Sequence, residues 1–383
     1  MFSARTAWDR TPNLLSTRLE MLVRRGTPPL DLTATSPAEC GLGHDEAWLR
    51  SIVGAQPLGQ LVTRQALARD LTRLGAHLEP GQIALSASTS EAYGWLFTLL
   101  CDPGDSVLVP APSYPLLPYL AELSSVELRS FPLPEDPLGA LDLDVLEAVA
   151  DETTRAVVLV SPANPTGWVL GEPDQARLDA LCARRDWALI ADEVFVEFPR
   201  RGPPARTVAA RPGEALTFAL QGLSKSAGLP GWKLAWTAVL GPAPERDEAL
   251  ARLELIADAH LSASSPAQRA LPAVLTGVSE WRTRVAQRLE QNARTLTAMR
   301  PPDAAWDVMP SAGGWSAVLR LPQTTDEVAV CLALLDAGVL VQPGHFYDFP
   351  RGRWLVLSLL PPPARFAEGV GRLARTLERV LQG

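Results

Sequence analysis

The chain has 383 residues, 47% of them hydrophobic and 20% charged, and a formal net charge of −8 at pH 7. This length allows a large core and two domains, and the acidic balance excludes a general attraction to nucleic acids or anionic membranes. No apolar run approaches the roughly 18 residues that cross a bilayer, the N-terminus lacks a signal-peptide core, and the four cysteines form no C-x-x-C, so we expect a cytoplasmic protein without a zinc site or disulfide framework.

The middle of the chain alternates short apolar runs with helix-like stretches. Six runs bounded by turn residues predict buried strands, at 82–88, 106–111, 155–162, 187–194, 216–222 and 234–241. Helix-like stretches such as 89–101 and 174–185 lie between several of them. This alternation predicts a three-layer α/β/α fold, in which helices cover both faces of a mostly parallel sheet.

After about residue 244 the pattern changes. Segment 245–300 has helical spacing, and it is followed by strand-like runs and a closing helix, at 315–321, 334–342, 354–360 and 362–381. These elements predict a smaller α+β domain. We therefore expect a large cofactor-binding domain over 46–244 and a small domain made of 1–45 and 245–383.

Lysine is almost absent from this chain. Among its 35 lysines and arginines, only Lys225 and Lys233 are lysines. Arginine stays protonated, whereas a lysine can lose its proton and attack a carbonyl group. Lys225 follows the apolar run 216–222 in a loop of small residues, the kind of place where α/β sheets bind ligands. Partial burial there would lower its pKa and favour Schiff-base formation. A solvent-facing loop lysine is the alternative.

Ser88, Thr89 and Ser90 follow the first predicted strand and open the helix that begins near Glu91. Free backbone N–H groups, three hydroxyl groups and the positive end of the helix dipole suit a phosphate dianion. Plain helix capping explains the same residues. Lys233 is a candidate for the cation of this phosphate site, with a surface position as the alternative.

Three further side chains follow predicted strands. Asn164 lies in SPANPTG, Asp192 ends WALIAD, and Tyr114 lies in PAPSYP. An aspartate at the end of a buried run needs a partner for its charge, and a protonated pyridine nitrogen would be one; a salt bridge or helix cap is the alternative. Tyr114 suits stacking on a flat ring, and packing within its loop explains it equally. For Asn164 the alternative is simple turn formation.

The order of these groups is more specific than any one of them. A phosphate cradle, an aromatic ring, an amide, an acid and an amine follow one another, each after a predicted strand, as a phosphorylated pyridine aldehyde requires. The sequence here resembles the fold-type I pyridoxal-phosphate enzymes, specifically the class I/II aminotransferases, from about residue 50 to residue 360. The segments that carry the resemblance are QPLGQLVTRQALA, ALSASTSEA, CDPGDSVLVPAPSYP, SPANPTG, ADEVF, GLSKSAGLPGWKLAW and VLVQPGHF.

The resemblance implies a role for each matching residue. Lys225 would form a Schiff base with pyridoxal 5′-phosphate and then move a proton to and from the substrate Cα. Asp192 would hold the pyridine nitrogen protonated. Asn164 would bind the ring 3-oxygen and Tyr114 would stack on the ring. The remaining cofactor-binding residues would be Ser88, Thr89, Ser90, Phe195, Ser224 and Lys233.

The sequence departs from the family pattern around the cofactor. Phe195 stands where the family usually has a tyrosine, so it cannot donate a hydrogen bond to the ring 3-oxygen. Gly222 replaces a common phosphate-binding serine and Lys233 a common arginine. Ala55 stands where a tyrosine often reaches the phosphate of the neighbouring subunit.

A further departure concerns the substrate. Val356, in WLVLSLL, stands where the family usually has the arginine that binds the substrate α-carboxylate. Either another cation, Arg353 or Arg351, holds the carboxylate, or the substrate has none there, as in an amine or an amino-sugar-like compound.

Three other residues are candidates for the substrate pocket. Trp315 matches an aromatic position that lines the family's pocket, with a core position as the alternative. His345 and Tyr347, in PGHFYD, offer polar groups near the pocket, and local loop packing explains them equally.

These features predict an aminotransferase that moves an amino group between an amino donor and a keto acid, and the resemblance implies a homodimer, because active sites in the family lie between subunits. One alternative is a lyase or decarboxylase on the same cofactor, because the cofactor carries the chemistry and the pocket chooses the bond that breaks. Another is a sensor that keeps the fold without catalysis, although the first 45 residues show no basic recognition helix. A generic nucleotide-binding protein lacks support because neither G-x-G-x-x-G nor a P-loop motif occurs.

Overall fold

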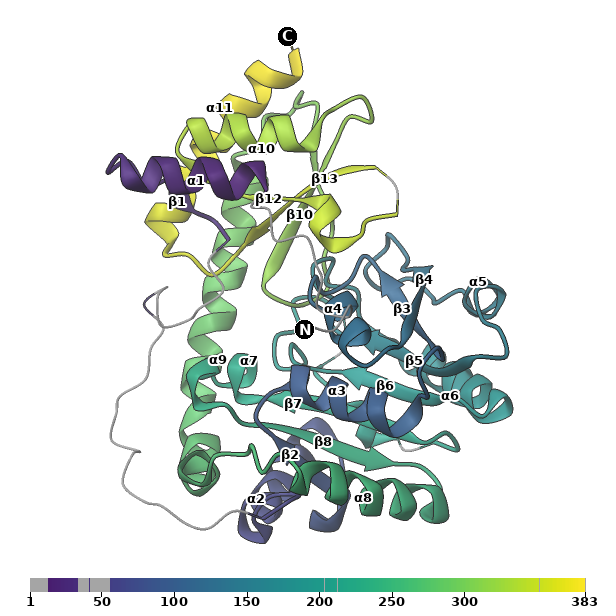
Figure 1. The fold of residues 1–383 in the computed structure, drawn as a ribbon. Helices are drawn as coiled ribbons and strands as arrows, with labels where there is room; N and C mark the ends of the chain where they lie inside the picture. Colours follow the sequence, from purple (N-terminus) through teal and green to yellow (C-terminus); the bar gives the residue numbers. More distant parts are fainter. Residues whose placement is uncertain are drawn as a thin grey trace, which may run out of the picture.

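The computed structural model describes residues 13–33, 41, 56–202, 204–211, 213–350 and 352–382. Figure 1 shows a seven-stranded sheet below and a four-stranded sheet above, with one long helix, α9 (Ser265–Ala298), running beside both. The molecule therefore has two parts, each built on its own sheet. The candidate residues lie at the carboxyl edge of the large sheet.

The large sheet has the strand order β2-β8-β7-β6-β5-β3-β4. Its strands are β2 (Ile83–Ser86), β3 (Ser106–Ala111), β4 (Glu127–Pro132), β5 (Thr154–Val160), β6 (Ala188–Asp192), β7 (Thr217–Gly222) and β8 (Ala235–Leu240). Only β8 is antiparallel to its neighbours. All six expected strands are present. The sequence does not predict β4, because this edge strand buries Phe131 alone.

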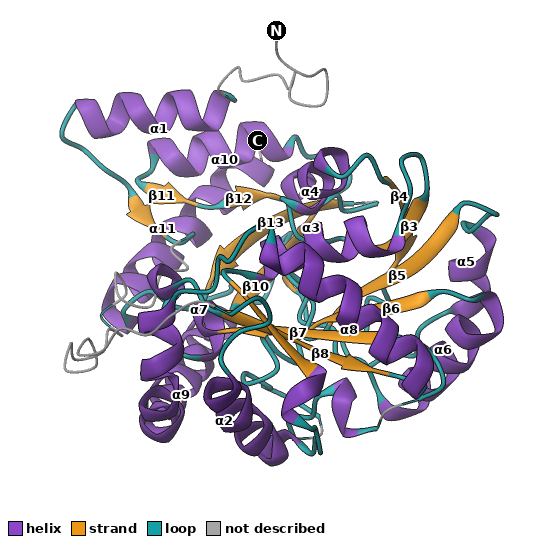
Figure 2. Cartoon of the chain, turned by 60° about the horizontal axis from the view of Figure 1, so that its bottom comes forward, coloured by secondary structure: helices purple, strands orange, loops and turns teal. Residues whose placement is uncertain are grey.

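Helices cover both faces of the large sheet. Successive strand residues point to opposite sides, so Val107 and Val109 join one apolar cluster and Leu108 joins another. The first cluster includes α3 (Thr89–Leu100), α4 (Leu117–Leu123) and α8 (Ala243–Asp258), and the second includes α5 (Leu143–Ala148) and α6 (Glu172–Arg185). Figure 2 shows these helices around the strands. The predicted three-layer α/β/α fold is confirmed.

Helix α9 links the two sheets. Its 34 residues span about 51 Å at 1.5 Å per residue. Buried side chains recur every three or four positions, as in a helix with one apolar face; they include Leu271, Val274, Val278, Trp281, Val285 and Leu289. Helices α2 (Leu61–Leu71) and α11 (Pro363–Gln382) pack against it.

The second sheet has the strand order β12-β13-β10-β9. Its strands are β9 (Asp307–Val308), β10 (Ser316–Leu321), β12 (Gln342–Pro343) and β13 (Arg353–Ser358), and α10 (Glu327–Asp336) accompanies them. The N-terminal segment joins this part, because α1 (Leu14–Arg24) packs on α10 and β1 (Leu30–Asp31) pairs with β11 (Val339–Leu340).

Segment 334–342 differs from the strand that its apolar pattern predicts. Helix α10 continues to Asp336, and only the short β11 and β12 follow it. A short apolar run has the same periodicity in a buried helix end as in a strand, so packing decides between the two. Among the described helices, none combines the length and the apolar character that a bilayer crossing requires.

Candidate active site

Three of the predicted residues meet because their strands are parallel neighbours. Asp192 is the last residue of β6, Lys225 follows the end of β7 by three positions, and Asn164 follows the end of β5 by four. β6 pairs with β5 on one side and β7 on the other. The carboxyl ends of parallel neighbours share one edge of the sheet, where ligands of α/β proteins bind.

Lys225 lies in α7 (Leu223–Ser226), a single helical turn. Its Nζ is 5.1 Å from the ring centroid of Trp315 and 5.7 Å from that of Phe195. Burial lowers the pKa of Lys225, although the charge of Asp192 opposes this. Among the described residues no carboxylate or hydrogen-bond acceptor pairs with Nζ, so the site favours a neutral amine that can act as a nucleophile.

The turn that carries Lys225 is held by α9. The Nε of Arg282 donates a hydrogen bond to the Ser226 carbonyl at 2.8 Å, and Arg282 also pairs with the buried Glu197 at 3.2 Å. Gly228 has a φ of +65°, and a side chain there would run into Trp281. The sequence analysis missed Arg282, because nothing distinguishes it from the other arginines along that helix.

Asp192 is buried and accepts two hydrogen bonds. The Val194 N–H donates to Oδ1 and the Tyr93 hydroxyl donates to Oδ2, each at 3.1 Å. Burial raises the pKa of Asp192 to about 6, while both hydrogen bonds and the charge of Lys225 oppose the rise. Tyr93 is a second residue that the sequence analysis missed, because in the apolar run of α3 it has the pattern of a core residue.

Glu193 follows Asp192 and is also buried. Its carboxylate accepts hydrogen bonds from the Thr207 hydroxyl, from the Val208 N–H at 2.6 Å and from the Gln221 amide at 3.0 Å. Burial raises the pKa of Glu193 to about 7. These bonds tie the end of β6 to β7 and to the 207–208 segment, which stabilises the position of Asp192.

The start of α3 supports both interpretations of its hydroxyl residues. The Ser88 side chain accepts from the Glu91 N–H at 3.1 Å, as a helix cap does. The N–H groups of Thr89 and Ser90 lie in the first turn, where no intrahelical acceptor exists. Lys233 is exposed on the loop before β8, with a φ of +50°.

Tyr114 and Asn164 lie after β3 and β5. Burial raises the pKa of the Tyr114 phenol, and a hydrogen bond with Ser90 opposes the rise. The Ser90 hydroxyl thus links the helix start to the predicted stacking residue. Asn164 is half-buried, and its side-chain amide has no hydrogen-bond partner among the described residues. Ser224, beside Lys225, is also half-buried.

The predicted substrate-pocket residues separate into two groups. Trp315 is buried beside Lys225, with its ring edge-on to Phe195 at 5.5 Å. His345 is exposed and bonded to Glu327 at 3.3 Å.

Two more candidates have partners of their own. The buried Tyr347 donates its hydroxyl to Gln342, while its carbonyl accepts from the Ser113 N–H at 2.9 Å. Arg353 is exposed, and its guanidinium bonds the Gly352 carbonyl at 3.4 Å. Ala55 and Arg351 lie outside the described residues.

The structure explains two of the departures from the family pattern. A Cβ at Gly222 would lie 3.0 Å from the Cβ of Ala235 on the paired strand β8, so a serine would require Ala235 to shift. Val356 is buried in an apolar cluster with Val318, Tyr347 and Trp354. An arginine at that position would lie against apolar neighbours.

A sequence profile described as aminotransferase class I and II matches residues 55–371, which is most of the chain. The chain belongs to the class I and II aminotransferase family. This family depends on pyridoxal phosphate, so the protein is a pyridoxal-phosphate-dependent aminotransferase that acts on an amino donor and a keto acid. The expected enzyme class and cofactor are confirmed, and the similar proteins do not favour a lyase, a decarboxylase or a sensor.

Proteins with sequences similar to this aminotransferase include an alanine aminotransferase and a glutamate-pyruvate aminotransferase. It is 26% identical over 370 residues to the alanine aminotransferase of Mycobacterium tuberculosis, covering 91% of this chain and 85% of that protein. It is also 26% identical over 382 residues to a glutamate-pyruvate aminotransferase of Escherichia coli, with coverages of 93% and 92%.

Solved structures share the fold. The alanine aminotransferase from Pyrococcus furiosus aligns with a TM-score of 0.90 at 19% identity, covering 99% of this chain and 100% of that one. An aminotransferase from Escherichia coli aligns with a TM-score of 0.87 at 21% identity, covering 100% of this chain and 99% of that one.

The polar groups of the aminotransferase fit pyridoxal phosphate. Lys225 is an amine without a bonded acceptor, and Asn164 is an amide without a partner among the described residues. Asp192 is a buried carboxylate whose hydrogen bonds come from a backbone N–H and a phenol. Buried polar groups need partners, and an aldehyde, a ring oxygen and a ring nitrogen would satisfy these three.

Proposed function

We propose that Lys225 is the catalytic amine of this aminotransferase and binds the cofactor as a Schiff base. The observation that carries this proposal is the environment of Nζ, which lies among the rings of Trp315 and Phe195 and near Asp192, without a bonded carboxylate. An amine in these surroundings loses its proton more readily than one in water. With the cofactor bound, Nζ would also be the group that takes the proton from the substrate Cα and returns it during amino transfer.

The other site residues bind and orient the cofactor. Bound pyridoxal phosphate supplies an aldehyde that accepts an amine and a protonated ring that withdraws electrons. We assign the ring nitrogen to Asp192, the 3-oxygen to Asn164 and the ring face to Tyr114. The phosphate belongs to the start of α3 (Ser88, Thr89 and Ser90), with Ser224 and Lys233 from the β7–β8 loop.

The rings of Phe195 and Trp315 lie next to Nζ and exclude water from it, without forming a hydrogen bond to it. Both side chains are buried, and their rings meet edge to face. Phe195 has no hydroxyl, so Asn164 is the candidate that remains for the 3-oxygen. Because the Tyr93 hydroxyl donates a hydrogen bond to Asp192, Tyr93 would be a positioning residue that fixes the carboxylate we assign to the ring nitrogen.

A homodimer is the assembly that we propose. Apolar side chains about half-exposed at the start of α2 and after α8 support it, namely Leu61, Val62 and Leu261. Gln268 joins these two segments, accepting from the Gln60 N–H at 2.7 Å and donating to the Ala263 carbonyl at 2.8 Å. Ser262 donates to Glu91, in the first turn of α3, at 2.6 Å. The apolar patch is thus close to the proposed phosphate site.

We also propose a cytoplasmic location and the division into a large part, 46–244, and a small part, 1–45 with 245–383. The acidic composition and dispersed cysteines support the location. Because α8 packs on the large sheet and α9 runs beside both sheets, the packing favours a boundary within α9 rather than at residue 244.

The Schiff-base assignment is tested by absorbance and peptide mapping. Purified protein incubated with pyridoxal phosphate should show the absorbance band of a Schiff base. Reduction with borohydride should then attach the cofactor, as a permanent label, to the peptide that contains Lys225. Lys225→Ala should bind the cofactor without that band and without amino transfer. Lys233→Ala is the control and should keep the label. A label on any residue other than Lys225 would refute the assignment.

A further inference from the structure

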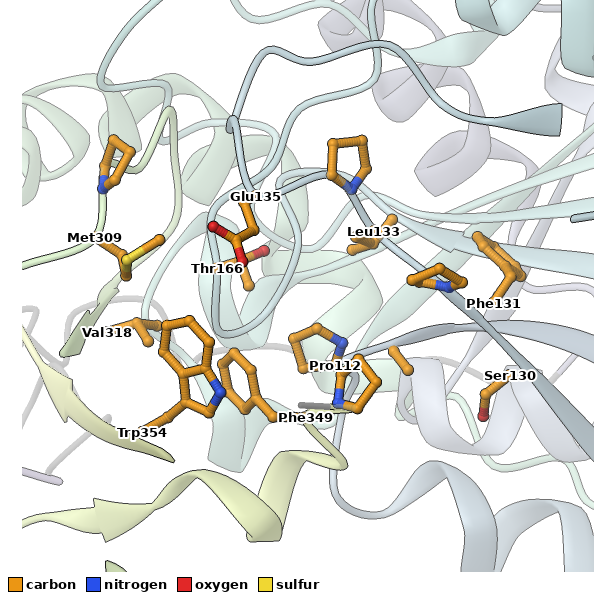
Figure 3. Close-up of a pocket in the computed structure, with 15 residues that line it drawn as sticks. Pro112, Ser130, Phe131, Leu133, Glu135, Thr166, Met309, Val318, Phe349 and Trp354 are labelled. Carbon is orange, nitrogen blue, oxygen red and sulfur yellow. The ribbon is translucent and has the colours of Figure 1, made fainter. Parts of the chain in front are cut away.

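A cavity of about 470 Å³ lies between the two sheets, within the size range of small-molecule sites. One wall comes from the ends of β3 and β4 and includes Pro112, Phe131 and Leu133. Figure 3 shows these side chains facing the cavity from the large sheet. None of the three carries a polar side-chain atom, whereas Ser130 and Thr166 add hydroxyl groups to the lining.

The opposite wall comes from the small sheet and is also apolar. It includes Met309, Val318, Phe349 and Trp354, and the rings of Phe349 and Trp354 stack at 4.9 Å with 21° between their planes (Figure 3). Val318 pairs with Val356 across β10 and β13, and both belong to one apolar cluster with Trp354. The valine at the family's arginine position therefore packs against two residues of this wall, Val318 and Trp354.

The cavity lies beside two loops that carry cofactor-binding candidates. Pro112 precedes Tyr114 by two positions, and the lining residue Thr166 follows Asn164 by two. On the other wall, Val318 and Trp315 lie on opposite faces of the small sheet, because Val318 belongs to the cluster that contains Trp354 and Trp315 to the cluster that contains Leu319. The link between the cavity and the Lys225 site is therefore made by the loops after β3 and β5.

Among the described lining residues and their partners, charge is confined to one ion pair at the cavity edge. Glu135 is the only charged lining residue described, and it pairs with Arg320 at 3.1 Å, where both side chains are substantially exposed. The Arg320 guanidinium lies 5.9 Å from the Trp354 ring centroid. No lysine, arginine or histidine is among the described lining residues. A substrate carboxylate inside would find no cationic partner among these described lining residues, which is unfavourable.

We propose that this cavity binds an uncharged apolar substituent of the amine substrate, of aryl or branched-alkyl size, in place of a carboxylate. The inference rests on the proposed function of Lys225. Apolar walls from two parts of the chain would exclude water from such a group, and its burial favours binding in proportion to its apolar area. The amino donor is thus a hydrophobic amine, or a hydrophobic amino acid whose side chain enters the cavity while its α-carboxylate stays outside.

A donor panel tests this inference on the cofactor-loaded enzyme. L-phenylalanine and 2-phenylethylamine are compared with L-glutamate and L-aspartate in the first half-reaction, followed by the absorbance of the bound cofactor. We expect kcat/KM for the better apolar donor to exceed that for the better acidic donor by at least about tenfold. Equal or better acidic donors would overturn the cavity proposal alone. Absence of reaction with every donor would instead overturn the proposed function.

A matched pair of variants tests the location. Phe349→Ala removes part of the wall, and it should lower kcat/KM for L-phenylalanine about tenfold while changing the value for L-alanine less than about threefold. Phe346→Ala, in the same loop but outside the lining, is the control and should change neither. If the two variants behave alike, the aryl group binds elsewhere and the proposal fails.

One further variant tests the alternative that Arg320 binds the substrate. A calorimetric measurement tests binding without turnover. Arg320→Gln should leave the apolar donors unaffected; loss of their activity would show that Arg320 binds the substrate. Calorimetry with 3-phenylpropan-1-ol, which has no amine to react, should show binding with a negative heat-capacity change to the wild type and weaker binding to Phe349→Ala. Equal binding to both proteins would contradict the proposal.

Discussion

Tyr93 reaches Asp192 across the fold, from the second turn of α3 to the last residue of β6. The carboxylate is buried, so each hydrogen bond it accepts favours its charged form against desolvation. A carboxylate that stays charged can pair with a protonated ring nitrogen, whereas a protonated acid cannot. The single phenol of Tyr93 therefore helps to set the protonation state of the whole site.

The pH dependence of the cofactor-free protein tests this electrostatic account. The folded pKa of Asp192, about 6, is above the ordinary value of 3.8, so the folded state binds the proton more tightly than the unfolded state. The free energy of unfolding should therefore fall as pH rises from about 4 to about 6, by up to roughly 3 kcal/mol for this group. Asp192→Asn should remove that part of the fall, as measured by urea unfolding at pH 5 and pH 8.

Tyr93→Phe should enlarge the fall in the free energy of unfolding with rising pH. Loss of the hydrogen bond raises the pKa of Asp192 further, so the variant should lose an additional 1–2 kcal/mol or so between pH 5 and pH 8 and bind pyridoxal phosphate about tenfold more weakly at pH 8. Tyr119→Phe, on the partly exposed surface of α4, is the control. Unchanged cofactor affinity in Tyr93→Phe would show that the phenol has no positioning role.

At the scale of elements, α9 connects the Lys225 turn to the rest of the molecule. Arg282 bonds the Ser226 carbonyl and pairs with Glu197, and Glu197 also pairs with Arg73. Glu197 and Arg282 are largely buried, with side chains 5% and 13% exposed. A buried carboxylate that loses one of its partners is costly, so the network resists movement of the helix relative to the turn.

Arg282→Met should lower the stability of the protein and shift the titration of the cofactor bound to Lys225. We expect the free energy of unfolding to fall by about 3 kcal/mol, and the absorbance of the bound cofactor to titrate at a shifted pH because the turn is no longer fixed. Arg284→Met is the matched control, since Arg284 is half-exposed and pairs with Glu280 at 3.7 Å on the same helix; it should change stability by less than about 1 kcal/mol. A destabilised Arg282→Met with an unchanged titration would mean that Arg282 is only structural.

At the scale of the whole molecule, the position of the exposed apolar patch is the feature that bears on how two copies assemble. Leu61, Val62 and Leu261 lie on segments linked to Glu91 and hence to the start of α3. Exposed apolar groups that gather beside a binding site are typical of a surface that another chain covers. A second copy at this patch would bring its residues close to the phosphate of the first.

The double variant Val62→Glu, Leu261→Glu should therefore be monomeric. Sedimentation velocity is expected to show a dimer for the wild type and a monomer for the variant, with weaker retention of pyridoxal phosphate because the phosphate end is uncovered. Val23→Glu, on α1 at the other end of the molecule, should remain dimeric. A wild type that sediments as a monomer would refute the homodimer.

The alternation of apolar runs and helical stretches was sufficient to predict the layered sheet, because buried parallel strands require apolar residues on both faces. The end-of-strand positions of Asp192, Asn164 and Lys225 were sufficient to predict that these three residues lie at one edge of the sheet, because parallel strands end at one edge; their roles at the site remain predictions. Only the tertiary structure revealed Tyr93, Arg282 and the apolar cavity beside Val356. These depend on contacts between residues far apart in the chain, and packing rather than local pattern determines which distant side chains meet.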